Sequence, residues 1–148
     1  MTMTRYQKAA DYHHKGFNCC QSILAAFTDR TGLSEQASFD AAAGFGAGMQ
    51  TGEACGAIAG AVMTLGLLHP VDPENPVASK RRTGALAKEF QKRFQEKFGA
   101  LRCAPLLKTK IQTGDHTPAA QEMELTNRCD ILIITAVEIV EEMLQEGT

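Results

Sequence analysis

A nearly unbroken apolar stretch rich in glycine and alanine constrains the fold of this chain most. Residues 54–68 contain a single polar side chain, that of Thr64. Because a helix that is apolar on all its sides is buried, we expect a helix over 54–68 at the centre of the fold, buried on every side. Gly56 and Gly60 stand four residues apart, and a glycine costs about 1 kcal/mol in a helix interior relative to alanine. This spacing predicts a flank where a second backbone, of this chain or of another subunit, packs closely.

Helical periodicity and capping residues predict an all-α fold for the rest of the chain. Asn18 suits the N-cap of a helix that begins at Cys19. The glycine-rich stretch 44–52 predicts a loop that needs positive φ angles or close backbone approach. We therefore expect a single compact domain over residues 1–148, with five or six helices and no strand. Besides 54–68, helices are expected over 4–15, 19–28, 37–43, 77–98 and from Asn127 onward, with turns at 103–107 and 118–125, a proline-rich break at 69–76 and a loop over 108–117.

Composition and charge place the chain among ordinary globular proteins. It has 148 residues, 44% of them hydrophobic, and a formal net charge of -2. The N-terminal residues lack the apolar segment of a secretory signal, and the longest apolar run is shorter than the ~20 residues that cross a bilayer. We expect a cytoplasmic protein without a membrane span. Its five cysteines are then expected to be reduced thiols, metal ligands or catalytic groups rather than structural disulfides.

Positive charge gathers in one part of the sequence. Residues 80–110 hold ten of the 15 Lys and Arg residues but only two of the 17 Asp and Glu residues. We interpret this segment as a solvated helix face that attracts acidic parts of the same chain or of a second subunit. A surface that binds anions or nucleic acid is the alternative, but no aromatic residue is interleaved to stack bases and no nucleic-acid-binding motif is present.

Four separated cysteines coincide with the expected helix starts. At a helix N-terminus, unpaired N–H groups and the helix dipole stabilise an anion, so a cysteine there has a lowered pKa and a reactive thiolate. The alternative is that each cysteine is a small buried hydrophobe. No Cys-x-x-Cys pair occurs, which argues against a thioredoxin-type site and ordinary zinc fingers. The candidate redox or metal-ligating residues are Cys19, Cys55, Cys103 and Cys129.

The remaining polar candidates are weaker. Cys20 is next to Cys19 but points about 100° away around the helix, and we expect it only to pack. His13 lies on the apolar side of the first helix, and we interpret it as a core or boundary histidine rather than a ligand or base.

These cysteines carry a resemblance to a known family. The segments Gly16-Phe17-Asn18-Cys19 and Cys55-Gly56-Ala57-Ile58-Ala59-Gly60, followed by single cysteines at 103 and 129, resemble the C-GCAxxG-C-C family of redox-active proteins. The resemblance covers nearly the whole chain and leaves Cys20 outside the pattern. It implies a small, mainly helical protein whose Cys19, Cys55, Cys103 and Cys129 do redox or metal chemistry.

Two classes of function remain open. The first is a thiol-based redox or electron-transfer protein, in which the four cysteines form reversible disulfides or hold an iron–sulfur cluster. The second is a non-catalytic protein that binds zinc or another thiophilic metal. Gly56 and Gly60 are the candidate cofactor-binding residues. We also expect a homodimer with an unknown redox partner, and neither nucleic-acid binding nor a membrane span.

Overall fold

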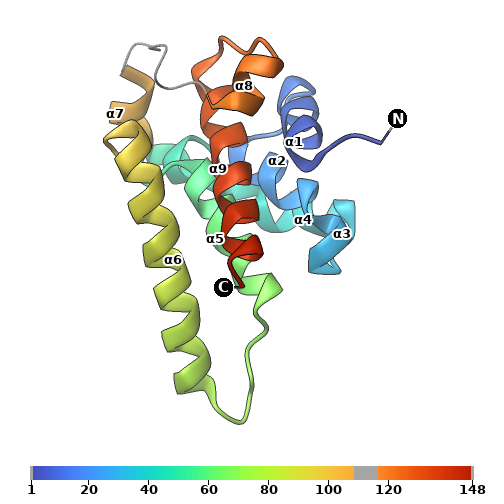
Figure 1. Cartoon of the computed structure of the whole chain (residues 1–148), viewed down its shortest axis with the longest axis vertical. Helices are drawn as coiled ribbons and strands as arrows, with labels where there is room; N and C mark the ends of the chain where they lie inside the picture. The colour runs from blue at the N-terminus through green and yellow to red at the C-terminus, as the bar shows by residue number, and fades with distance from the viewer. Residues whose placement is uncertain (1, 109–116, 148) are drawn as a thin grey trace.

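The fold is all-α, as the periodicity predicts. A computed structural model describes residues 2–108 and 117–147 of the chain, and helices make up most of these residues (Figure 1). They contain no strand, and one isolated antiparallel bridge joins Ala54 and Arg102. Most of the loop expected over 108–117 lies outside the described residues. The helices are α1 (Arg5–His14), α2 (Cys19–Ala26), α3 (Thr28–Thr31), α4 (Glu35–Ala42), α5 (Gly56–Leu68), α6 (Pro76–Phe98), α7 (Cys103–Lys108), α8 (Pro118–Glu122) and α9 (Arg128–Gln145), with a 3-10 turn η1 (Ala43–Phe45) and a π-helical turn η2 (Gly48–Gly52).

Side-chain caps start the helices where the sequence places them. The Asn18 side chain accepts a hydrogen bond from the Gln21 amide and starts α2. Asn127 does the same for α9 by accepting from the Asp130 amide. At the C-terminal end of α6, Gly99 takes the left-handed conformation that ends a helix. These caps depend on neighbours in sequence, which is why the sequence predicts them well.

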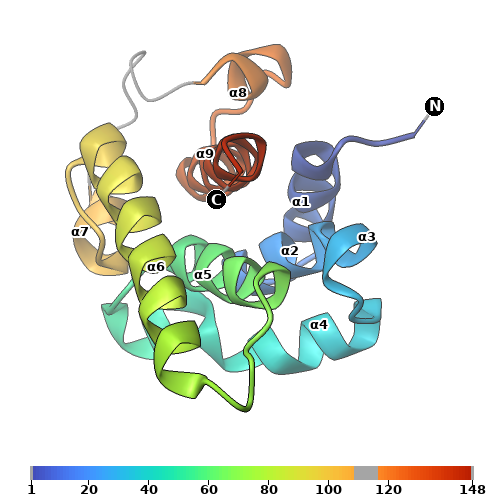
Figure 2. The ribbon, with the colours of Figure 1, turned by 60° about the horizontal axis from the view of Figure 1, so that its bottom comes forward.

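Helix α9 is deeply buried among other helices of the fold. Figure 2 looks nearly along α9 and shows α1, α2, α5, α6 and α8 arranged around it. The four consecutive residues 131–134 of α9 are each at most 1% exposed. The expectation that helix 54–68 is buried on every side is wrong, because Ala59, Met63 and Leu67 of α5 stay partly exposed. These three side chains pack on a small cluster formed by α2 and α4, which covers that side only in part.

The glycine flank of α5 packs against α2 within the same chain. A Cβ atom built on Gly60 would lie 3.0 Å from the backbone oxygen of Cys20 and 3.1 Å from the Cβ of Ile23. A Cβ on Gly56 would lie 3.2 Å from the Cβ of Cys19. These distances are shorter than ordinary contacts, so the two helices approach closely only because both positions are glycine.

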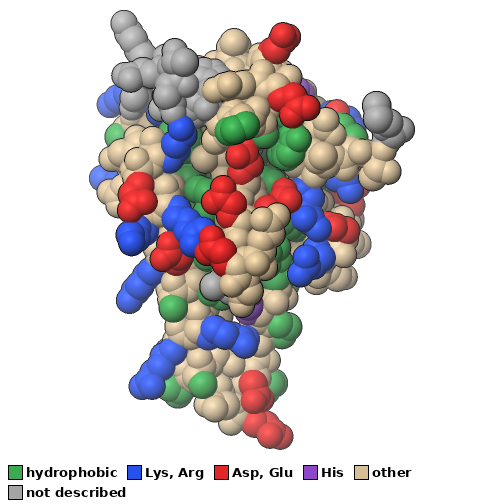
Figure 3. Space-filling model, in the orientation of Figure 1, with side chains coloured by type: hydrophobic (Ala, Val, Ile, Leu, Met, Phe, Trp, Pro, Cys, Tyr) green, Lys and Arg blue, Asp and Glu red, His purple; other side chains and the backbone are tan. Residues whose placement is uncertain are grey.

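The basic helix α6 pairs in part with the acidic end of α9. Figure 3 shows Lys and Arg side chains along α6 and Asp and Glu side chains over α9, side by side where the two helices meet. Arg93 is 2.6 Å from a carboxylate oxygen of Glu146 and 2.8 Å from one of Glu89. We expected acidic partners for the basic segment 80–110, and Arg93 finds its partners within the same chain.

Neither the glycine flank nor Arg93 needs a second subunit, so the homodimer stays a prediction.

In the part of the chain that the structure describes, no helix combines the length and the apolar character that a membrane span requires.

The contact between α2 and α5 predicts the effect of filling Gly60. We expect Gly60→Leu to lower the free energy of unfolding by about 3 kcal/mol or more, because the side chain must displace the backbone of α2. Gly84→Leu in α6 is the matched control, since nothing lies within 4 Å of a Cβ built there. That variant should be about 0.5–1 kcal/mol more stable than the wild type, because leucine has the higher helix propensity. Urea unfolding measures both values, and equal stability of the two variants would contradict the close contact.

Candidate functional site: a cavity lined by four cysteines

Four of the five cysteines line a single cavity. The cavity has a volume of about 220 Å³, and Cys19, Cys55, Cys103 and Cys129 all contribute to its wall. Cys20 does not. The four therefore share one site although they come from four different helices. The rest of the wall is formed by His13, Asn18, Ala47, Gly56, Leu106, Leu107 and Leu132.

Each of these cysteines stands at the start of a helix, as the sequence analysis expects. Cys19 and Cys103 are the first residues of α2 and α7, and Cys55 is the N-cap of α5. Cys129 is the second residue of α9. The four helix starts thus meet around the cavity.

A backbone bridge holds the Cys55 and Cys103 segments together. The Cys55 amide donates to the Leu101 carbonyl at 2.9 Å, and the Cys103 amide donates to the Glu53 carbonyl at 2.6 Å. Because side chains alternate between the two faces of such a bridge, Cys55 and Cys103 lie on the same face. This short pairing directs both thiols to the cavity.

Glycines allow the loop before α5 to reach the cysteines. Gly48 has φ +60°, and a Cβ atom there would collide with the Glu53 backbone nitrogen and lie 2.9 Å from the Cβ of Cys103. A Cβ on Gly46 would lie 2.6 Å from the Cβ of Asn18. The expected need for positive φ or close approach is met at these two positions. Gly56, one of the two candidate cofactor-binding residues, lines the cavity, whereas Gly60 lies one turn further along α5 against α2.

Cys19 and Cys129 are two half-buried thiols in the cavity wall that influence one another. The hydrogen bond from Cys19 to Cys129 is the largest influence on both groups. It raises the pKa of Cys19, and burial raises it further. The pKa of Cys129 falls to about 6, because this hydrogen bond and the positive charges of His13 and Arg128 outweigh burial. Within this pair the pKa of Cys129 is the lowered one and the pKa of Cys19 is the raised one.

The other two cavity cysteines are more deeply buried. Cys55 is 2% exposed, and burial raises its pKa to about 11 although the backbone amides of Ala57 and Ile58 act in the opposite direction. Burial also raises the pKa of Cys103. A helix start therefore does not activate every thiol here, because loss of water outweighs the helix dipole at Cys55 and Cys103.

Cys20 points away from the cavity, as expected. Its Sγ lies 3.7 Å from the Sδ of Met63, and it packs with Leu24 and Ala42 in a small apolar cluster. Burial raises its pKa to about 12.

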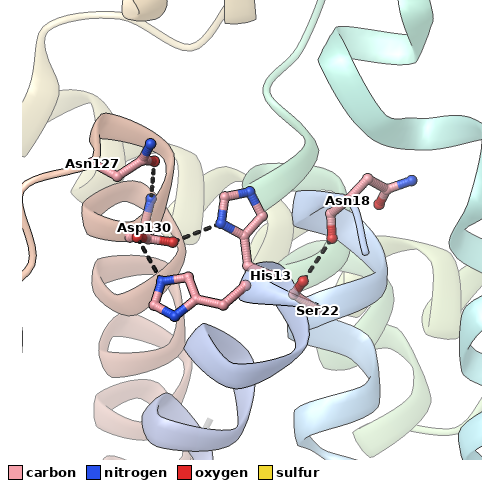
Figure 4. Close-up of polar contacts among 6 residues, drawn as sticks. His13, Asn18, Ser22, Asn127 and Asp130 are labelled. Atoms are coloured by element: carbon pink, nitrogen blue, oxygen red, sulfur yellow. Dashed lines mark hydrogen bonds and ion pairs between the residues drawn. The ribbon is translucent and has the colours of Figure 1, made fainter. Parts of the chain in front are cut away.

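A carboxylate between two histidines adjoins the cysteine pair. Nδ1 of His13 lies 2.6 Å from Oδ1 of Asp130, and Nε2 of His14 lies 2.8 Å from Oδ2 of the same side chain (Figure 4). His13 is expected as a core or boundary histidine, and its side chain is 22% exposed. Asp130 is not among the residues expected at the site. The available signals are two adjacent histidines at a helix end and an acidic residue directly after Cys129.

The cavity contains the type of side chain that binds metal ions, but these side chains are too far apart to bind one together. Thiolates are the ligands that zinc and iron–sulfur clusters prefer. Among residues 2–108 and 117–147, however, no three His, Cys, Asp or Glu side chains are close enough together to hold a metal ion. All five cysteines are free thiols in this arrangement.

The contacts of Gly48 predict the effect of a methyl group at this position. We expect Gly48→Ala to destabilise the fold by about 1–3 kcal/mol, because its φ is positive and the new atom would meet the Glu53 backbone. We also expect Cys103, which is 8% exposed, to become more accessible to alkylating reagents. Gly44→Ala is the control, since nothing lies within 4 Å of a Cβ there. Mass spectrometry after brief alkylation measures the change, and equal protection of Cys103 in both variants would contradict this role for Gly48.

The different surroundings of the thiols predict an order of reactivity. At pH 7 Cys129 should react with iodoacetamide first, with a rate that is half its maximum near pH 6, because its lowered pKa keeps the thiolate as the pH falls. Cys55 should stay unreactive up to about pH 9, because its raised pKa keeps it protonated. Peptide-resolved mass spectrometry gives each rate, and the urea-unfolded protein is the control in which all five cysteines should react alike. A Cys129 no faster than the other thiols at pH 7 would refute this order.

Comparison with known proteins bears on the same four cysteines. The family model described as "Putative redox-active protein (C_GCAxxG_C_C)" matches residues 17–143. A comparison with curated proteins and one with solved structures find no match. The matched range contains all four cysteines of the cavity and confirms the resemblance noted in the sequence. The chain therefore belongs to the C_GCAxxG_C_C family.

Proposed function

We propose that this protein is a dithiol–disulfide redox protein in which Cys19 and Cys129 form the reversible pair. The observation that carries the proposal is that these two half-buried thiols line the wall of one cavity, where each of them changes the pKa of the other. Two cysteines can form a disulfide when their Cα atoms come within about 4.4–6.8 Å of one another. Membership in a family described as redox-active supports the same chemistry.

The two cysteines take different roles in this reaction. Cys129 has the lowered pKa and is the nucleophile that attacks an incoming disulfide. Cys19 stays protonated next to it and is the resolving thiol, which attacks the mixed disulfide and releases the product. The cavity of about 220 Å³ accepts a small group rather than a folded segment.

Cys55 and Cys103 supply a second dithiol in this proposal. They lie on one face of the backbone bridge and line the same cavity. A disulfide formed at the first pair can pass to them by exchange, since thiolate attack on a disulfide transfers the bond from one pair to another. Their raised pKa values make them slow until such an exchange begins.

Disulfide mapping tests the proposal. After exposure of the reduced protein to a small disulfide, peptide mass spectrometry should find Cys19 joined to Cys129 as the first intramolecular disulfide. Cys19→Ser and Cys129→Ser should each abolish it, whereas Cys20→Ser is the matched control and should leave it intact, because Cys20 packs outside the cavity. A different first pair, or none, would overturn the assignment.

The same preparation tests the metal alternative. Elemental analysis of anaerobically purified protein should find no stoichiometric zinc or iron if the four thiols work as dithiols. Stoichiometric metal that is lost in serine variants of each of the four cavity cysteines would favour the zinc or iron–sulfur alternative instead, because a shared site fails when one ligand is lost.

A further inference from the structure

His13 connects the cysteine cavity to a buried carboxylate. Its side chain belongs to the wall of the cavity together with Cys19 and Cys129. Its Nδ1 is bound to Asp130, so its Nε2 is the nitrogen left for other partners, and Figure 4 shows that nitrogen directed away from Asp130. A nucleophilic thiol, an imidazole and a carboxylate bound to the far side of the imidazole are the groups from which activated cysteine sites are built.

Asp130 is well placed to hold His13 in one orientation. It is 4% exposed and is the third residue of α9, where its amide donates to the capping side chain of Asn127. Burial alone would raise its pKa, but the hydrogen bonds from His13 and His14 outweigh this and lower it. Asp130 is therefore a carboxylate that accepts from both imidazoles, which keeps a proton on Nδ1 of His13.

We propose that His13 is the acid–base residue of the Cys19–Cys129 reaction and that Asp130 is its positioning residue. This inference rests on the proposed dithiol–disulfide function and adds the group that moves the protons. Sequence reasoning does not reach it, because His13 and Asp130 are 117 residues apart.

The proposal balances the protons and electrons of disulfide exchange. The Cys129 thiolate attacks a substrate disulfide, a Cys129–sulfur bond forms, the substrate S–S bond breaks, and the leaving thiolate takes a proton from His13. Neutral His13 then accepts the proton of Cys19 while the Cys19 sulfur attacks the Cys129 sulfur and displaces the second substrate thiolate. That thiolate takes the proton back from His13. The dithiol has lost two electrons to the substrate disulfide, which leaves as two thiols.

The charges around His13 and Cys129 agree with this role of His13. The hydrogen bond to Asp130 raises the pKa of His13, and the negative charges of Asp130 and Cys129 raise it further, against the effect of burial. In turn the positive charge of His13 is among the influences that lower the pKa of Cys129. Several titratable or charged groups surround His13 and Cys129. They are His14 from α1, Cys19 from α2, Cys55 at the start of α5, Cys103 from α7, and Arg128 and Asp130 from α9.

His14 provides a matched control. It binds the same carboxylate as His13, but its side chain is 54% exposed and it takes no part in the cavity wall. A purely structural role of the carboxylate would make the two histidines equivalent. A role in thiol chemistry distinguishes them.

The first test uses the unmodified protein and so does not depend on a variant that folds. NMR follows the ring signals of both histidines against pH in the dithiol form and in the Cys19–Cys129 disulfide form. We expect the pKa of His13 to fall on oxidation, because the negative charge of Cys129 is lost. The ring signals of His14, which lies outside the cavity wall, should differ little between the two forms. The same His13 titration in both forms would overturn the inference.

The second test compares His13→Gln with His14→Gln. In His13→Gln the pH profile of Cys129 alkylation should move to higher pH. If the pKa of Cys129 rises by about one, the thiolate fraction at pH 6 falls about fivefold. His14→Gln should stay within about twofold of the wild type. Equal profiles for the two variants would refute the role of His13.

Disulfide mapping of the wild type separates the two levels of the proposal. A wild-type Cys19–Cys129 disulfide combined with equal His13→Gln and His14→Gln profiles would reject the role of His13 and keep the proposed function. Absence of that disulfide in the wild type would reject both.

Discussion

The close contact between α2 and α5 is the constraint on which the cysteine site depends. Gly56 and Gly60 bring the start of α5 against Cys19 and Cys20 at distances shorter than most Cβ atoms show. Cys55 precedes this contact directly, so its thiol reaches the same cavity as Cys19. The glycines that weaken the helix by propensity are thus the residues that bring two thiols of the site together.

The same cavity gives its thiols different chemical properties. Burial raises the pKa of Cys55 and Cys103, while Cys129 keeps a lowered pKa because Cys19 donates to it and His13 and Arg128 carry positive charge nearby. A helix start is common to all of them and so does not explain the difference. Desolvation and individual partners decide which thiol is reactive.

Helix α9 is central to both the fold and the site. Its residues 131–134 are buried among five neighbouring helices, and the residues directly before them supply Cys129 and Asp130. The acidic far end of the helix pairs with Arg93 of α6. Because the reactive end is anchored by a fully buried segment, the positions of Cys129 and Asp130 relative to α1 and α2 are held by the core itself.

The sequence by itself determines where the helices start and that four cysteines stand at those starts, because capping and periodicity act between residues a few positions apart. Asn18, Asn127 and the thiols that follow them illustrate this. Only the tertiary structure decides that one side of α5 stays partly exposed while most of α9 is buried, since burial depends on which helices cover a face. It also decides that Cys19 and Cys129 line one cavity and that His13 binds Asp130. These partners lie more than 100 residues apart in the sequence, and no local pattern encodes a contact that forms only when α1, α2 and α9 pack together.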